Sequence, residues 1–327
     1  MNFIFGPVNS RRLGISLGID LLPPKICNFN CIYCEVGPTT EFTNERGEYA
    51  DTAAIIAEIE AFRADEAAVA RLDVLTITAS GEPTLHLGLG EIIAHCKKKI
   101  AKPVAVLSNG SLLHDPQVRR ELAQADIIIP SLDAARDESF RRINRPDRQC
   151  RLSEIIDGLV AFRREFTGHY WLEILLAKGI NDTPADLAAL AAAVARIKPE
   201  RVQLNTVARP PLESFARPLR AEELRAAAAA LPVTVDILTD RAADAPPLVR
   251  DVLASKRGRR EDEEEVLHLL RRRPCTAADI STALGMERER VDQATAQLTA
   301  AGHVGTSHHR DQKYYIVLPR GQEHPQD

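Results

Sequence analysis

The chain has 327 residues, of which 45% are hydrophobic and 27% charged, as in an ordinary globular protein. Its net charge of −4 excludes the strong global attraction to nucleic acid or anionic lipid that a basic protein shows. Its longest apolar runs fall well short of the roughly 20 residues that span a bilayer, and residues 1–7 lack the features of a secretory signal, so we expect a cytoplasmic protein without membrane contact.

Strand-like and helix-like segments alternate between residues 13 and 240. Apolar, β-branched strands are expected at 13–22, 72–79, 104–108, 126–132, 170–176, 202–207 and 233–238. Helices are expected at 53–69, 89–100, 116–125, 152–166, 185–197 and 221–231. This alternation predicts βαβ units and a parallel sheet, and the nearly continuous apolar strands predict burial on both faces. The fold class is therefore α/β, with fewer units than the eight of a closed TIM barrel.

A different pattern follows residue 240. The stretch 241–258 contains Ala-Pro-Pro and loses periodicity, which is typical of a linker. Helices are expected at 261–272, 276–284 and 288–300, and a two-stranded ribbon at 304–317. This order resembles a winged helix-turn-helix, whose helix-turn-helix unit docks on DNA in other proteins. Residues 259–320 hold ten Lys/Arg and ten Asp/Glu, which disfavours DNA and favours contact with protein or substrate. We expect a core with an N-terminal extension at 1–240, this small domain at 259–320 and a tail at 321–327.

Three of the six cysteines stand close together, with the spacing C-x3-C-x2-C. Cys27, Cys31 and Cys34 can grip one compact metal centre, and an iron–sulfur cube normally takes four cysteine ligands. Three ligands leave one iron open, and an open metal position is where chemistry takes place. A structural zinc site would need a fourth ligand near Cys34, and a disulfide would leave one of the three thiols unpaired. The remaining cysteines are expected to be buried apolar side chains outside any cluster: Cys96, Cys150 and Cys275.

This spacing, with the aromatic Tyr33 just before the last cysteine, resembles the radical S-adenosylmethionine (radical SAM) superfamily. The resemblance implies a partial (β/α)6 barrel, one [4Fe–4S] cluster on the three cysteines, and S-adenosyl-L-methionine (SAM) on the open iron. It implies reductive cleavage of SAM to methionine and a 5′-deoxyadenosyl radical, with the electron supplied by a donor of flavodoxin or ferredoxin type. Tyr33 is expected beside the adenine, as the matching aromatic is in relatives.

Ser80-Gly81-Glu82 follows the second expected strand. Glycine lets a backbone approach closely, and a carboxylate accepts hydrogen bonds from an ammonium group. The run resembles the Gly-Gly-Glu motif of the superfamily, which binds the amino group of SAM, although position 80 is serine here. The resemblance therefore implies that Glu82 holds the SAM amino group.

Short polar side chains end three further strands. Ser108 and Asn109 lie in a region that approaches the methionine or ribose part of SAM in relatives. Ser131 and Asp133 lie two residues apart, so they point the same way from a strand and could share the ribose hydroxyls. Asn205 is expected to support the adenine side of SAM. The alternative for the residues at 108–109 and 131–133 is a turn or a helix cap, and the alternative for Asn205 is a structural ion pair.

The substrate-side candidates are all basic, and no catalytic residue is assigned. Arg11 and Arg12 lie between glycine turns and could bind phosphate or carboxylate. Lys178 and Arg209 end the fifth and sixth expected strands and could bind an anionic substrate. The alternative for Lys178 and Arg209 is a structural ion pair.

Three segments together resemble an uncharacterised radical SAM group usually placed near the wyosine-type tRNA synthetases: 5–14, 23–34 and 203–211. Those tRNA enzymes carry further cysteines upstream of the cluster motif, and no cysteine precedes Cys27 here. The expected function is a radical SAM enzyme that abstracts hydrogen from a tRNA base, a peptide or protein, or a small molecule. The alternatives are an activating enzyme that installs a glycyl radical on a partner protein, and an iron–sulfur-dependent DNA-binding regulator.

Overall fold

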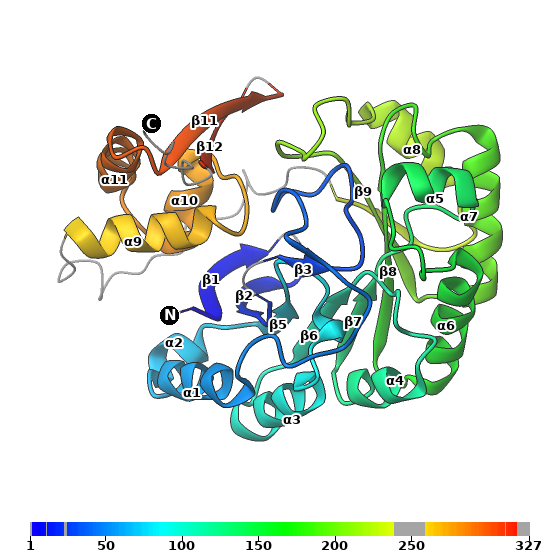
Figure 1. The fold of residues 1–327 in the computed structure, drawn as a ribbon, viewed down its shortest axis with the longest axis horizontal. Coiled ribbons are helices and arrows are strands. Elements are labelled where there is room, and N and C mark those ends of the chain that lie inside the picture. Colours follow the sequence, from blue (N-terminus) through cyan, green and yellow to red (C-terminus); the bar gives the residue numbers. More distant parts are fainter. Residues whose placement is uncertain (1, 11, 23–24, 239–258, 311, 319–327) are drawn as a thin grey trace, which may run out of the picture. The chain divides into compact units, whose positions relative to one another are not determined.

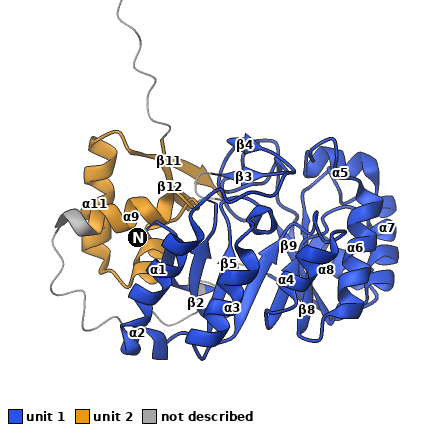
Figure 2. Cartoon of the chain, turned by 60° about the horizontal axis from the view of Figure 1, so that its bottom comes forward, with its two compact units in different colours: residues 1–243 blue, residues 244–327 orange. Residues whose placement is uncertain are grey.

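A computed structural model describes residues 2–10, 12–22, 25–238, 259–310 and 312–318 of the chain. The chain divides into two compact units, Met1–Ala243 and Asp244–Asp327 (Figure 2), and each is described by itself. The expected linker at 241–258 and tail at 321–327 lie outside the described residues. None of the described helices combines the length and the apolar character that a membrane crossing requires.

An eight-stranded sheet is the centre of the first unit (Figure 1), with the order β1-β2-β5-β6-β7-β8-β9-β10. The strands are β1 (Ile4–Ser10), β2 (Gly14–Asp20), β5 (Val74–Thr78), β6 (Val104–Ser108), β7 (Ile127–Pro130), β8 (His169–Leu176), β9 (Arg201–Thr206) and β10 (Val235–Ile237). β1 is antiparallel to β2, and all other neighbours are parallel. In the described part of the chain the edge strands β1 and β10 do not pair, so the barrel is open. The predicted α/β class with a partial barrel is confirmed.

Helices follow the strands and lie along one face of the curved sheet (Figure 1). They are α1 (Thr52–Arg63), α2 (Glu66–Ala70), α3 (Leu89–Lys99), α4 (Pro116–Leu122), α5 (Asp137–Ile143), α6 (Leu152–Glu165), α7 (Pro184–Ile197) and α8 (Ala221–Ala229). Thr183 caps the start of α7, and its hydroxyl accepts a hydrogen bond from Asp186 N at 3.2 Å, which satisfies a helix-end donor. The Asp186 carboxylate also accepts from Ser139 Oγ at 2.5 Å, so it ties α5 to α7.

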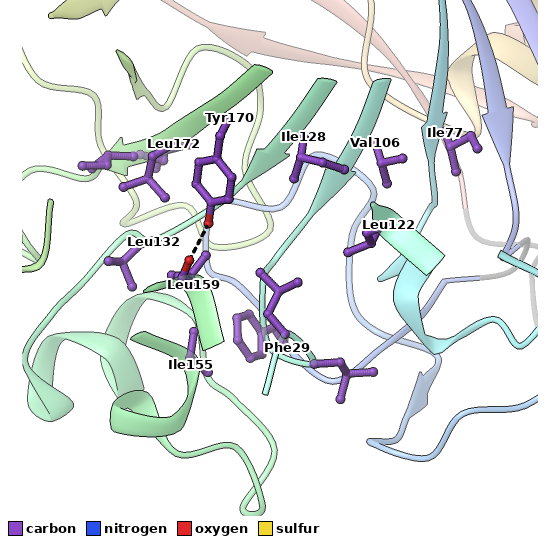
Figure 3. Close-up of a cluster of buried hydrophobic side chains, with 14 of the residues drawn as sticks. Phe29, Ile77, Val106, Leu122, Ile128, Leu132, Ile155, Leu159, Tyr170 and Leu172 are labelled. Atoms are coloured by element: carbon purple, nitrogen blue, oxygen red, sulfur yellow. Dashed lines mark hydrogen bonds between the residues drawn. The ribbon is translucent and has the colours of Figure 1, made fainter. Parts of the chain in front are cut away.

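One face of the sheet packs against the helices, and the other carries residues that line a cavity. Successive side chains of a strand point to opposite faces. On β8, Tyr170 is fully buried against α6, where its hydroxyl donates to Leu159 O at 3.2 Å (Figure 3). Its ring lies 6.0 Å from that of Phe162. Glu173 points to the opposite face and lines a cavity. The apolar face thus fixes the sheet on its helices, and this packing orients the polar residues of the other face toward the cavity.

The second unit contains three helices and a hairpin. They are α9 (Arg259–Leu270), α10 (Ala277–Leu284), α11 (Arg288–Ala300), β11 (Val304–His309) and the antiparallel β12 (Gln312–Val317). Gly285 caps the end of α10 with the left-handed φ of 59° that glycine adopts at low cost. Val266, Ile280, Val291 and Tyr314 are buried in the core of this unit. The elements agree with those expected from the sequence, and the identity of the unit as a winged helix stays a prediction.

Candidate active site

The cysteine motif lies on a loop between two very short strands. β3 (Ile26–Cys27) pairs with β4 (Glu41–Phe42), and the loop between them carries Cys31 and Cys34. The loop is held by backbone hydrogen bonds to the segment after α5, among them Asn30 N to Asn144 O at 3.0 Å. All three cysteines line one cavity of about 290 Å³. The structure therefore brings together the three thiols that the spacing singled out.

Hydrogen-bond donors already face two of these thiols. Phe29 N lies 3.4 Å from Cys27 Sγ, and Asn144 Nδ2 lies 3.4 Å from Cys31 Sγ. Burial, followed by the nearby charge of Asp133, raises the pKa of Cys31 to about 12, so the thiol is protonated when no metal is bound. A bound metal displaces such protons, and N–H donors to the sulfurs tune an iron–sulfur centre.

The opposite wall of the cavity carries the Ser80-Gly81-Glu82 run after β5. Gly81 lies so close to the cysteine strand that a Cβ atom there would be 1.6 Å from Ile26 O. Glu82 N donates to the same oxygen at 3.0 Å. Only glycine fits this approach, and the contact fixes Glu82 relative to Cys27.

Glu82 is buried, with 1% of its surface exposed, and its carboxylate oxygens are used unequally. Oε1 accepts hydrogen bonds from the Thr84 backbone and hydroxyl and from Ser108 Oγ, whereas among the described residues Oε2 accepts one, from Asn109 N at 2.6 Å. A carboxylate offers about four acceptor positions, so Oε2 retains one. Burial raises the pKa of Glu82 in opposition to these hydrogen bonds, and an added cation would favour its charged form.

A third group of cavity residues joins the cysteine loop to β7 and β8. Asp133 accepts hydrogen bonds from Tyr33 Oη at 2.6 Å, Asn144 Nδ2 at 2.7 Å and Leu175 N at 2.9 Å. Burial raises the pKa of Asp133 to about 6 although these hydrogen bonds lower it. Asp133 therefore positions Tyr33. It also binds Asn144, and Asn144 in turn contacts the thiol of Cys31.

Most of the predicted cofactor residues share this cavity. Its lining includes Tyr33, Ser80, Gly81, Glu82, Ser108, Asn109, Ser131 and Asp133. Asn205 does not line it, and its Nδ2 donates to Glu173 Oε1 at 3.4 Å. Glu173, which lines the cavity, also forms an ion pair with Arg12. Arg12 therefore reaches the cavity wall through Glu173.

The other substrate-side candidates lie apart from the cavity lining. Lys178 is half-exposed and pairs with Glu223 at 3.0 Å and Asp182 at 3.3 Å. Arg209 pairs with Glu35, next to the last cysteine, at 3.1 Å. Arg11 lies outside the described residues.

Sequence reasoning missed Asn144, Lys25 and Phe140, which also line the cavity. Lys25 stands two positions before Cys27, and its ammonium group donates to Gly37 O at 2.6 Å. Lys25 is buried, and lysine is almost never fully buried without a partner, but this burial follows from the fold and no sequence signal shows it. Asn144 and Phe140 follow no motif, and only the fold brings them to the cavity.

The donor set fits an iron–sulfur cluster better than a single zinc ion. Three thiols are soft ligands that suit such clusters. Across the described ranges, no three His, Cys, Asp or Glu side chains converge as the ligands of one metal ion would. A cube of four irons needs its cysteines further apart than one ion does, because each binds a different iron.

The radical SAM superfamily model matches residues 21–191. The chain belongs to the radical SAM superfamily, and this membership implies an enzyme with SAM-dependent radical chemistry. Within it, the chain belongs with the UPF0026 proteins. The one from Methanocaldococcus jannaschii is 34% identical over 222 residues, which cover 68% of this chain and 68% of that protein.

One further relative and one solved structure resemble the chain. "GTPase Obg" of Brachyspira hyodysenteriae is 36% identical over 301 residues, which cover 92% of this chain and 43% of that protein. The chain thus spans less than half the length of that relative. The crystal structure of a radical SAM methyltransferase from Sphaerobacter thermophilus has a TM-score of 0.50, covers 68% of this chain and 66% of that chain, and is 19% identical. This last likeness shows the fold alone.

Proposed function

We propose that the protein is a radical SAM enzyme in which Cys27, Cys31 and Cys34 hold one [4Fe–4S] cluster and leave one iron for SAM. The supporting observation is that the three thiols and the Glu82 carboxylate line the same cavity. When bound, the cluster and SAM would supply a 5′-deoxyadenosyl radical that abstracts hydrogen from a substrate. The protein contributes binding, orientation and exclusion of water.

Glu82 is the residue that binds the SAM amino group in this proposal. Its Oε2 keeps one acceptor position after the hydrogen bond from Asn109 N, and a charge-assisted hydrogen bond to an ammonium group is strong in a buried site. Gly81 sets the distance between this carboxylate and the cysteine strand. Ser108 donates a hydrogen bond to Oε1, so the acceptor position left for the SAM amino group is on Oε2.

The adenosine part of SAM is assigned to the side of the cavity that Tyr33, Ser131 and Asp133 line. Tyr33 is fixed by its hydrogen bond to Asp133, so its ring is held in place before the adenine arrives. Ser131 has a hydroxyl for the ribose. Asn205 acts from behind Glu173 as a positioning residue.

The substrate side is assigned to Glu173 and Arg12. Arg12 Nη1 is buried and has no hydrogen-bond partner among the residues that the structure describes, and an unsatisfied buried donor is costly unless something binds it. The proposed substrates, a tRNA base, a peptide or protein, or a small molecule, can each carry a group that accepts a hydrogen bond from this atom. The proposed setting is the cytoplasm, and the proposed reductant is a flavodoxin- or ferredoxin-type donor.

The second unit is proposed to be a winged-helix module that contacts protein or substrate rather than DNA. Its helix α11 occupies the recognition position, and two of its arginines are already paired. Arg288 contacts Asp292 at 3.0 Å, and Arg290 contacts Asp262 at 2.5 Å. Arginines that already pair with carboxylates attract phosphate groups less strongly.

Replacement of Glu82 by glutamine tests the SAM site. We expect Glu82→Gln to keep its iron and to weaken SAM binding by on the order of 10- to 100-fold, because a charge-assisted hydrogen bond is worth about 1.5–3 kcal/mol. Anaerobic calorimetry with SAM gives the affinity, and iron analysis reports the cluster.

The matched control is Asp186→Asn, which neutralises another buried carboxylate, on α7 and outside the cavity lining. That variant should bind SAM as the wild type does. Unchanged SAM affinity in Glu82→Gln would show that Glu82 does not hold the amino group.

A further inference from the structure

A second hollow of about 780 Å³ lies beside the cysteine loop. Asn30, Thr39 and Phe42 line it from the loop, and residues of α5 and the segment that follows line the other side. Four of these are arginines, and we call the site the arginine hollow: Arg141, Arg145, Arg148 and Arg151. The hollow is separate from the SAM cavity, but Phe140 lines both.

The residues that line the arginine hollow carry a formal charge of +2, from four arginines and two aspartates. Among the described residues, the acidic side chains of its lining are Asp137 and Asp147, and Asp147 already accepts a hydrogen bond from Gln149 N at 2.8 Å. Arg145 pairs with Glu213 at 2.5 Å and Arg151 with Glu154 at 3.6 Å.

Two of the four arginines have free guanidinium groups. Arg141 and Arg148 are exposed, and within the described ranges neither forms a hydrogen bond or an ion pair through its side chain. Unpaired surface arginines on one rim attract an anionic partner.

One layer of residues separates the arginine hollow from the cluster ligands. Asn144 precedes Arg145, and its Nδ2 lies 3.4 Å from Cys31 Sγ. Asp147 N donates to Asn28 O at 2.8 Å, next to Cys27. A short hydrogen-bonded path therefore joins the rim to the sulfur ligands.

We propose that the arginine hollow is the docking surface for an acidic one-electron carrier protein. This inference rests on the proposed function, which needs one electron for each SAM cleaved. On docking, the carrier is oxidised by one electron, and the centre held by Cys27, Cys31 and Cys34 is reduced by that same electron. No proton or other atom is transferred in this step.

Position and surface character favour a carrier protein over a nucleic-acid substrate. A substrate has to reach SAM in the first cavity, whereas the arginine hollow is a separate space beside the cysteine loop, and Phe140 lines both. Phe42, 46% exposed, adds an apolar contact among the charges. An aromatic anchor with a charged rim is typical of a protein–protein interface.

The test uses the full chain, reconstituted anaerobically, and a flavodoxin as the acidic carrier. In the double variant Arg141→Glu/Arg148→Glu, we expect the Kd for oxidised flavodoxin, measured by biolayer interferometry, to rise at least about tenfold at low salt. Raising the salt from about 0.05 M to about 0.5 M should weaken wild-type binding and change the variant little. The ratio of SAM cleavage driven by reduced flavodoxin to that driven by photoreduced deazaflavin should fall in parallel.

The control is Arg164→Glu/Arg225→Glu, which makes the same charge change at exposed positions outside the arginine hollow and should bind flavodoxin normally. No wild-type binding, or equal binding by the double variant, would overturn the inference. So would a double variant that loses affinity for a tRNA mixture but keeps that for flavodoxin, because the hollow would then be a nucleic-acid site. If deazaflavin drives no SAM cleavage in the wild type, the proposed function fails, and the binding data still decide the docking surface.

Discussion

Cys31→Ala is expected to abolish both iron binding and SAM cleavage. Cys31 lines the cavity with Cys27 and Cys34, and its sulfur is the one that Asn144 contacts. Loss of one of three ligands leaves two irons without a protein partner, and a four-iron cube with two open corners is not held. We expect iron to fall from about four atoms per chain to near zero, and 5′-deoxyadenosine release under strong reductant to fall below detection.

Cys150→Ala is the matched control for this variant. Cys150 is a half-buried cysteine on the segment after α5, and its thiol contacts Asn44 rather than the SAM cavity. That variant should keep its iron and its SAM cleavage. If Cys31→Ala still cleaves SAM, the assignment of the cluster ligands is wrong.

Gly81→Ala is expected to be nearly as damaging, although the added group is one methyl. The new Cβ would be 1.6 Å from Ile26 O, and the obstacle is backbone that cannot rotate away. Either Ile26 and Cys27 or Glu82 must move, which breaks the Glu82 N to Ile26 O hydrogen bond. Overpacking costs typically 1–3 kcal/mol and occasionally more, and for a backbone clash this close we expect about 3 kcal/mol or more. Urea unfolding, iron content and SAM affinity should all decline.

Gly179→Ala separates this clash from backbone strain. Gly179 has a φ of 74°, and nothing lies within 4 Å of an added Cβ. Its alanine variant should lose only about 1 kcal/mol, the cost of a left-handed residue, and keep its iron and SAM affinity. If Gly81→Ala behaves like Gly179→Ala, the close approach of the two loops is not what positions Glu82.

Strands and long helices could be read from the sequence because their apolar patterns are strong. β6 and α11 begin and end where expected. The expected helix at 53–69 is instead two helices, α1 and α2, because α1 ends at Arg63 and the Asp65 side chain caps the next helix by accepting a hydrogen bond from Ala68 N. The composition stays rich in alanine and glutamate across that break, so periodicity alone did not reveal it.

β1 and α5 were not expected, and each has a physical reason. β1 contains Gly6 and Pro7, which break a strand pattern, but it lies at the sheet edge and its register shifts between Phe5 and Val8. Edges and bulges are where proline is tolerated. α5 is seven residues long and mostly polar, so it has too few turns to show an apolar stripe.

The residues of the site that belong to sequence motifs could be predicted from the sequence. The cysteine loop follows β2 and Glu82 follows β5, and they lie together because the carboxyl ends of these parallel neighbours meet at one edge of the sheet. The roles of Asn144 and of the Arg12–Glu173 pair follow from long-range packing, since the partners lie 113 and 161 positions apart. No local pattern contains that information. The carboxylate of Asp133 also turned out to be engaged with Tyr33 and Asn144, which the strand pattern could not show.

The central claim is that three cysteines hold a four-iron cluster whose open corner binds SAM. Electron paramagnetic resonance of the anaerobically reconstituted and reduced protein, recorded without and with SAM, tests it most directly. We predict the signal of a reduced four-iron cluster, with a shape that changes when SAM is added. A protein that binds zinc or no metal at these cysteines, or an iron–sulfur signal that SAM leaves unchanged, would contradict the claim.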